Sequence, residues 1–210
     1  MIKPRVELLF ITRDSEKLIE TVGRTSYLSF DRQKEGSEKD FIRMLLRNRH
    51  FSVFEHAYAT FRISGVSRAF THQLVRHRLC SFIQQSQRYV DEKEFKYIEP
   101  DSIGQNPHAH NIFSEFMEKA RETYKMLQEM KIRREDARYV LPNAVESQIV
   151  VSANFRQWRH IIELRGSPQS QWEFRRVVIE ILKILKTHSP TVFEDFEIDE
   201  EKEIIRPIKK

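Results

Sequence analysis

The sequence predicts a single α+β domain over residues 1–210, and three observations carry this prediction. Apolar residues near the C-terminus recur with the period of an amphipathic helix, whereas two short stretches in the first third have the patterns of strands. No internal repeat, low-complexity stretch or linker divides the chain. Since 210 residues are enough for one substantial core, helices and strands packed in one domain are the simplest expectation.

Three elements are expected at the N-terminus. Residues 6–12 form a short apolar run, which is typical of a buried strand. A helix is expected from Asp14 to about Arg24, with Asp14 or Ser15 as its N-cap residue. Residues 37–40 open a second helix, because apolar side chains follow them on one side.

A second strand and a third helix are expected next. Residues 57–64 alternate between apolar and polar types, as a strand with one buried face does. Ser67 is placed to cap the following helix. On that helix Gln73 would lie beside both Arg76 and His77, three and four residues further on.

The middle of the chain is expected to contain one long loop and two helices. Pro100–Pro107 has the composition of the loop. A helix from residue 111 to about residue 131 would bury an apolar stripe that includes Phe116. Residues 134–141 are expected to be helical, and Pro142 ends them.

The last third is expected to be mainly helical. Residues 149–152 fit either a strand or a helix, and residues 154–164 form a helix. An apolar stripe at helical spacing predicts a buried helix through Phe174, Val177, Val178, Ile181, Leu182 and Leu185. The acidic tail from about residue 194 onward is expected to be a solvated or docking segment.

The charges are unevenly distributed along the sequence. Between His56 and Val90 there is no Asp or Glu, but there are five arginines: Arg62, Arg68, Arg76, Arg78 and Arg88. The whole chain has 36 Lys+Arg and 31 Asp+Glu, so its net charge of +5 equals the charge of this segment. We call residues 57–89 the acid-free window. Because no neighbouring carboxylate competes for these arginines, the window is suited to hold an anion.

Composition narrows the class of protein. The single cysteine, Cys80, excludes an intramolecular disulfide and fits a reducing cytosol. Neighbouring arginines would lower its thiol pKa, although packing is the more usual role for such a residue. His72 and His77 are five residues apart and would not share a metal on a helix, so no metal site is expected. No apolar run is long enough to span a membrane, and a cytoplasmic protein is expected.

Several groups of polar residues could bind a ligand. Residues 76–78 are three cationic or potentially cationic side chains in a row, and residues 84–88 add amides, a hydroxyl and an arginine. Each group taken alone is also compatible with a solvated surface. Arg138 precedes an apolar turn into proline, and residues 154–165 form a helix with an unusual polar content. Together they favour a pocket for anionic ligands.

These residues resemble a known family. Arg76-His77-Arg78, followed after seven residues by Ser86, resembles the signature of the flavin-dependent thymidylate synthases. Further blocks are similar to that family in the same order: Phe54-Glu55-His56, Gln73, Arg88-Tyr89, residues 137–142, residues 154–165 and Gln171-Trp172-Glu173. The similarity covers about residues 50–176.

The resemblance implies a fold and an activity. The fold would be a single α+β domain in which a small, mostly antiparallel sheet packs with several helices. The enzyme would methylate dUMP at C5 to give dTMP, with 5,10-methylenetetrahydrofolate as the carbon donor. FAD would carry the hydride and NADPH would reduce the FAD. The protein would be a homotetramer with active sites shared between subunits.

The resemblance also implies a role for each matching residue. The expected dUMP-binding residues are Gln73, Arg76, Gln84, Gln85, Ser86, Gln87, Arg88, Arg138 and Arg165. The expected FAD-binding residues are Ser52, Arg76, His77, Arg78, Gln84, Asn154, Arg156 and His160. Arg165 would be the catalytic residue, because a cation at the uracil edge favours the N3-ionised base and makes C5 nucleophilic. Some members have Glu at the position of Gln84 and Thr at that of Ser52.

Two other classes of function remain open from the residues alone. A nucleic-acid-binding module could use the same arginines, although such proteins usually spread cations over an exposed face with stacking aromatics. An assembly protein could pair the window's arginines with the acidic tail of another subunit. The placement of the arginines among apolar and amide residues favours a small-molecule site, with neither nucleic acid nor membrane as a partner.

Overall fold

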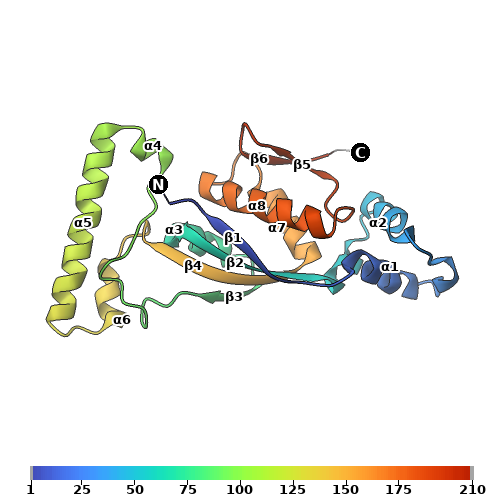
Figure 1. Ribbon diagram of the computed structural model, residues 1–210, viewed down its shortest axis with the longest axis horizontal. Helices are drawn as coiled ribbons and strands as arrows, with labels where there is room; N and C mark the ends of the chain where they lie inside the picture. Colours follow the sequence, from blue (N-terminus) through green and yellow to red (C-terminus); the bar gives the residue numbers. More distant parts are fainter. Residues whose placement is uncertain (1, 209–210) are drawn as a thin grey trace. The chain divides into compact units, whose positions relative to one another are not determined.

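The computed structural model describes residues 2–208, which form two compact units. The first unit comprises residues 2–5, 64–76 and 83–149, and the second comprises residues 6–63, 77–82 and 150–208. Helices and strands both occur, so the α+β class is confirmed (Figure 1).

A four-stranded sheet has the order β1-β2-β4-β3. Its strands are β1 (Arg5–Ile11), β2 (Tyr58–Ser67), β3 (Ser81–Gln84) and β4 (Glu146–Asn154). The strands expected at residues 6–12 and 57–64 are therefore confirmed, and the ambiguous run at residues 149–152 is part of a strand. The expected burial of the first strand is wrong, since no residue of β1 is buried and Phe10 is 56% exposed. Residues on β2 alternate between buried and less buried positions, as expected for a strand that covers a core.

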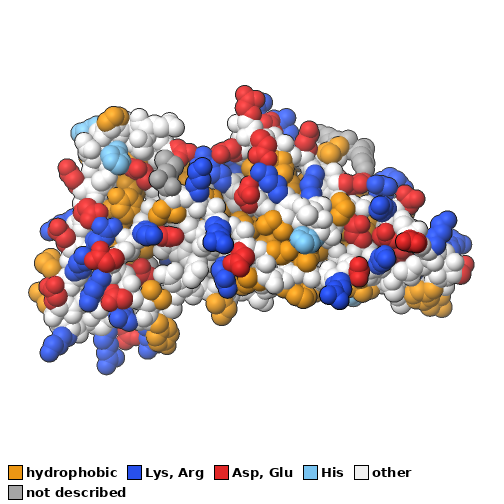
Figure 2. All heavy atoms as spheres, viewed as in Figure 1, with side chains coloured by type: hydrophobic (Ala, Val, Ile, Leu, Met, Phe, Trp, Pro, Cys, Tyr) orange, Lys and Arg blue, Asp and Glu red, His pale blue; other side chains and the backbone are white. Residues whose placement is uncertain are grey.

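The first unit contains five helical segments. They are α3 (Arg68–Leu74), α4 (Asp101–Gly104), α5 (Pro107–Glu129), α6 (Arg134–Ala137) and the 3-10 helix η3 (Arg138–Val140). Ser67 caps α3 as predicted, since its Oγ accepts a hydrogen bond from Phe70 N at 3.0 Å. Figure 2 shows basic and acidic side chains interspersed on the face over α5, rather than one basic patch.

Three expectations for the first unit are wrong. Helix α3 ends at Leu74, so Arg76 lies beyond it and is not a helical neighbour of Gln73. Most of the expected loop Pro100–Pro107 is helical, because Asn106 caps α5 and a proline is tolerated at the first helical position. Phe116 is 59% exposed, while Ala120 on the same helix is buried in the core.

The second unit contains six helical segments and a hairpin. The helices are α1 (Ser15–Thr25), η1 (Phe30–Arg32), α2 (Ser37–Arg47), η2 (Phe51–His56), α7 (Phe155–Arg165) and α8 (Trp172–His188). Asp14 lies at the N-cap position of α1, but its side chain makes no capping hydrogen bond. The predicted stripe of α8 is confirmed, since all six of its residues are buried.

The core of the second unit forms around α7 and α8. Trp158 is fully buried, its ring packs edge-on against Phe61 at 5.1 Å, and its Nε1 donates to Ala59 O at 3.0 Å. Because its ring is packed and its N–H is hydrogen-bonded, this residue fixes α7 against β2. The helix that carries several predicted site residues is therefore held rigidly.

The acidic tail is structured rather than solvated. Strands β5 (Phe196–Asp199) and β6 (Ile204–Pro207) pair in antiparallel register. Ile205 is 2% exposed, and its N–H donates to Gly166 O at 2.8 Å, at the end of α7. The tail thus docks on its own chain, because the adjacent Ile204 and Ile205 and the ring of Phe196 are buried.

Candidate functional site

The predicted site residues fall into two groups, one in each unit. The first unit contains the residues expected to bind dUMP, apart from Arg165: Gln73, Arg76, Gln84, Gln85, Ser86, Gln87, Arg88 and Arg138. The second unit contains Ser52, His77, Arg78, Asn154, Arg156, His160 and Arg165. Two residues expected to bind FAD, Arg76 and Gln84, lie in the first unit.

Gln84, the last residue of β3, and Gln85, which follows it, have partners within the first unit. Gln84 Nε2 donates to Thr71 Oγ1 at 2.7 Å, and Gln85 Nε2 donates to Glu92 Oε1 at 3.2 Å. Gln85 N also donates to Gln148 O at 2.9 Å, which continues the pairing towards β4. These amides therefore shape the segment that carries Arg88, in addition to any role towards a ligand.

Ser86 forms the turn that presents Arg88. Its carbonyl accepts hydrogen bonds from the N–H groups of Tyr89 at 3.2 Å and Val90 at 2.9 Å. Its Oγ accepts from Arg88 N at 3.3 Å. The guanidinium of Arg88 then lies 5.5 Å from the ring centre of Tyr89, within the range of a cation–π contact.

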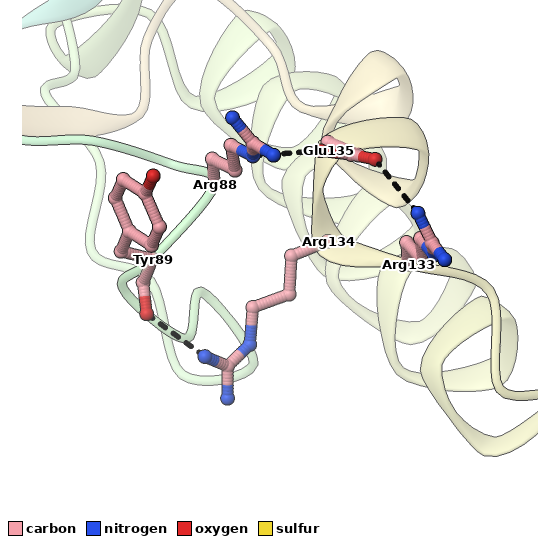
Figure 3. Close-up of a pocket in the computed structure, with 5 residues that line it drawn as sticks. All are labelled: Arg88, Tyr89, Arg133, Arg134 and Glu135. Carbon is pink, nitrogen blue, oxygen red and sulfur yellow. Dashed lines mark hydrogen bonds and ion pairs between the residues drawn. The ribbon is translucent and has the colours of Figure 1, made fainter.

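Arg88 lines a hollow of about 310 Å³ with four other residues, Tyr89, Arg133, Arg134 and Glu135 (Figure 3). Arg88 Nε lies 2.7 Å from Glu135 Oε2, and Arg133 Nη1 lies 3.5 Å from the other carboxylate oxygen. Arg134 Nη1 donates to Tyr89 O at 2.8 Å. The lining therefore holds three arginines against one carboxylate.

The expectation that carboxylates are absent around the window is wrong for two of its arginines. Arg88 pairs with Glu135, and Arg62 pairs with Glu7 at 3.0 Å. Both carboxylates are distant in the sequence, and folding brings them to the arginines. Within residues 2–208, Arg76 and Arg78 form no ion pair, so the expectation holds for the core of the signature.

Arg68, an arginine of the acid-free window that was not among the expected dUMP- or FAD-binding residues, and Arg138 are part of the same cationic region. Burial lowers the pKa of Arg68, Glu92 opposes this effect, and the charge of Arg138 adds to it. Burial likewise raises the pKa of Glu92, which is 4% exposed, against the effects of Gln85 and Arg68. Arg138 Nε donates to the backbone carbonyl of Glu135 at 3.1 Å.

In the second unit, Arg165 is bonded to His77. Arg165 Nε donates to His77 Nε2 at 3.0 Å, and its guanidinium lies 4.9 Å from the ring centre of Phe174. His77 is 6% exposed, and burial lowers its pKa to about 4, with further lowering by Arg165 and His160. His77 is therefore neutral at pH 7, with its proton on Nδ1, because Nε2 accepts from a guanidinium.

Helix α7 presents the other polar groups. Asn154 caps it, since its Oδ1 accepts from Gln157 N at 2.8 Å, and this leaves the amide NH₂ as a donor. Arg156 and His160 are both exposed, as expected for residues four apart on one face, and Arg156 pairs with Glu55. His160 lies 6.1 Å from His77, ring centre to ring centre. The sequence did not predict the pairing with Glu55.

Cys80 does not have the environment of a nucleophile. Burial raises its pKa to about 11, against a smaller opposite effect from a hydrogen bond with Gln157. The expectation that neighbouring arginines lower this pKa is therefore wrong, because burial dominates. At neutral pH the side chain is a thiol, which fits a packing role.

The acidic tail is paired within the second unit. Asp195 accepts hydrogen bonds from both terminal nitrogens of Arg159, at 2.8 and 2.6 Å. Glu203 pairs with Arg176 at 2.8 Å, and Asp199 pairs with Arg206 at 3.2 Å. These arginines lie outside the acid-free window, so these contacts give no support to an assembly protein that pairs its window with its tail.

Two further searches of residues 2–208 bear on the class of site. No cluster of three His, Cys, Asp or Glu side chains is arranged to hold a metal ion in this part of the chain. No helix among the described residues is long and apolar enough to cross a bilayer.

Comparison with known proteins gives consistent matches. Residues 7–191 match the family model described as thymidylate synthase complementing protein. A flavin-dependent thymidylate synthase of Corynebacterium glutamicum is 41% identical, and the match covers 88% of this chain and 81% of the relative. Enzymes with the same name from Mycolicibacterium vanbaalenii and Mycobacterium tuberculosis are 39% and 38% identical, covering 86% of this chain and 79% of each relative.

The fold is also similar to a solved structure. The crystal structure of thymidylate synthase X from Helicobacter pylori with FAD and dUMP superposes with a TM-score of 0.76. The superposition covers 91% of this chain and 98% of that one, at 24% identity, and supports the fold. The family model and the identity to the named relatives establish the family directly, so the chain belongs to the flavin-dependent thymidylate synthases.

Proposed function

We propose that this enzyme converts dUMP to dTMP, with 5,10-methylenetetrahydrofolate as the carbon donor, FAD as the hydride carrier and NADPH as the reductant. The observation that carries the proposal is family membership together with a cationic group of residues in each unit. The two groups match the needs of two phosphorylated ligands, a nucleotide and a dinucleotide.

The first unit supplies the groups that would bind the nucleotide. Arg88 and Arg138 both contact Glu135, and Arg138 lies close enough to Arg68 to affect its pKa. Such a concentration of guanidinium groups favours a phosphate ligand, because charge-assisted bidentate hydrogen bonds to phosphate are strong. Gln73 and the segment after β3 would complete the contacts to the nucleotide.

The chemistry of the donors in the second unit fits FAD. Arg78 forms no ion pair among the described residues, His160 is exposed, and Asn154 has its amide NH₂ to donate. Together with Arg156 and Ser52, these residues offer donors to a pyrophosphate and to sugar hydroxyls. When bound, the flavin supplies hydride chemistry that no side chain can provide.

Arg165 would act on the base of the nucleotide. His77 holds its Nε, and Phe174 lies under its guanidinium, so the charge is fixed in one position. A fixed cation at the uracil edge stabilises the N3-ionised base and raises the electron density at C5. The mechanism then needs no attacking thiol, which agrees with the raised pKa of Cys80.

The proposal includes a homotetramer with active sites shared between subunits. Several apolar side chains of the signature region and its surroundings are more than 70% exposed, namely Leu79, Ile83, Tyr89 and Tyr139. Large exposed apolar side chains near a polar site favour burial by another subunit. Light scattering of the purified protein measures the subunit number directly.

Product analysis tests the proposed reaction. Purified protein reconstituted with FAD should show flavin absorbance and form dTMP from dUMP when NADPH and methylenetetrahydrofolate are both present. Omitting methylenetetrahydrofolate should abolish dTMP, since it supplies the carbon. A folded protein that binds no FAD, or that forms dTMP without any flavin, would contradict the proposal.

A further inference from the structure

Glu135 contacts two arginines that are proposed to bind the nucleotide, and the inference drawn from this rests on the proposed function. Its Oε2 lies 2.7 Å from Arg88 Nε, and its backbone carbonyl accepts from Arg138 Nε at 3.1 Å. Figure 3 marks the ion pair between Glu135 and Arg88. All three residues belong to the first unit. One residue of α6 therefore fixes both guanidinium groups.

In both contacts the arginine uses its Nε atom. A guanidinium has five N–H donors in a rigid fork, and one of them is on Nε. When Nε is held by Glu135, the two terminal nitrogens remain the edge for bidentate contact with an anion. Arg88 and Arg138 are thus restrained in a way that leaves suitable donors to a phosphate.

The charge of Glu135 opposes an incoming phosphate, but a third arginine offsets it. Arg133 Nη1 lies 3.5 Å from Glu135 Oε1, so Arg88, Arg133 and Glu135 together carry a net charge of +1. The pairing of Arg88 is half-exposed, with 57% of its side chain and 29% of that of Glu135 accessible. The pair therefore orients Arg88 without removing it from solvent.

We propose that the Glu135 carboxylate is a positioning group for the nucleotide phosphate, which it serves by holding Arg88 at its Nε atom; the backbone carbonyl of the same residue holds Arg138 whatever the side chain. Restraining the flexible side chain of Arg88 before binding reduces the entropy lost when the phosphate arrives. The opposite role is that of a competing anion, which occupies Arg88 until the substrate displaces it. The two roles predict opposite changes in affinity.

Steady-state kinetics of Glu135→Ala and Glu135→Gln separate these roles. We expect Glu135→Ala to raise KM for dUMP about fivefold, the ratio expected for loss of a half-exposed ion pair. The value of kcat should stay within about twofold, because phosphate contacts lie away from the reacting carbon. Glu135→Gln retains an acceptor oxygen, so its KM should rise less. Inorganic phosphate should also inhibit Glu135→Ala more weakly than wild type.

Asp136→Asn is the matched control, since it removes one exposed carboxylate from the same helix and should leave KM unchanged. A lower KM in Glu135→Ala would establish competition and overturn the proposal. An unchanged KM would also overturn it, because Glu135 would then have no effect on binding. A parallel fall in kcat and FAD content would indicate a merely structural role. If wild type neither binds dUMP nor turns it over, the proposed function fails rather than the role of Glu135.

Discussion

The buried His77 predicts a specific dependence of stability on pH. Its pKa is lowered from 6.5 to about 4 in the folded protein, chiefly by burial. Below pH 6.5 the unfolded chain binds a proton that the folded protein does not, so stability falls as pH decreases towards 4. The slope is about 1.4 kcal/mol per pH unit, which gives up to about 3 kcal/mol over this interval.

The comparison with His77→Gln isolates this contribution. Glutamine offers an acceptor oxygen to Arg165 but does not titrate. The stability advantage of wild type over His77→Gln at pH 7 should therefore shrink by about 2.5–3 kcal/mol at pH 4.5. In thermal unfolding this corresponds to a change of roughly 5–10 °C in the difference between the two Tm values.

Differential scanning calorimetry of both proteins from pH 7.5 to 4.5 measures the effect. The other titratable groups are the same in both proteins, so their contributions largely cancel in the difference. Tm differences that stay constant with pH would refute the reasoning, because they would mean that His77 binds its proton in the folded state as readily as in the unfolded chain. A difference that grows as pH falls would show that His77 is protonated and stabilised in the fold.

Three further changes have defined outcomes. Arg165→Ala should lower kcat for dTMP formation by about 100-fold or more, the usual loss for one group that stabilises developing charge, while FAD absorbance is retained; loss of the flavin would assign the residue to cofactor binding instead. Cys80→Ala should remain active, since a thiol with a pKa of about 11 is not a nucleophile at pH 7, and an inactive but folded variant would restore that role. Ser67→Ala should lower the free energy of unfolding by about 1 kcal/mol through loss of the cap on α3, whereas urea denaturation with no change in midpoint would show that the cap contributes nothing.

The sequence predicted secondary structure correctly where a local pattern is compatible with only one kind of element. The stripe from Phe174 to Leu185 has helical spacing and is buried, and Ser67 caps α3 as its position suggested. The prediction of a loop over Pro100–Pro107 was wrong, because proline is as compatible with the first position of a helix as with a loop. Phe116 shows that spacing alone does not decide which flank of an apolar stripe is buried.

The sequence named the residues expected in the site, but it did not indicate which side chains form ion pairs and hydrogen bonds with them. The resemblance named Arg88 and Arg165, yet their partners Glu135 and His77 lie 47 and 88 residues away in the sequence. No local pattern links such residues, because folding alone brings them together. The prediction for Cys80 was wrong for the same reason. Its neighbours in the sequence suggested a lowered thiol pKa, but burial in the fold raises that pKa.

The most direct test of the central claim follows the hydrogen at C5 of the nucleotide. FAD-loaded wild type should release tritium from dUMP labelled at C5, at a rate that requires both NADPH and methylenetetrahydrofolate, and Arg165→Ala should release little. Tritium that stays on the nucleotide with folded, flavin-loaded wild type and both co-substrates present would contradict the account.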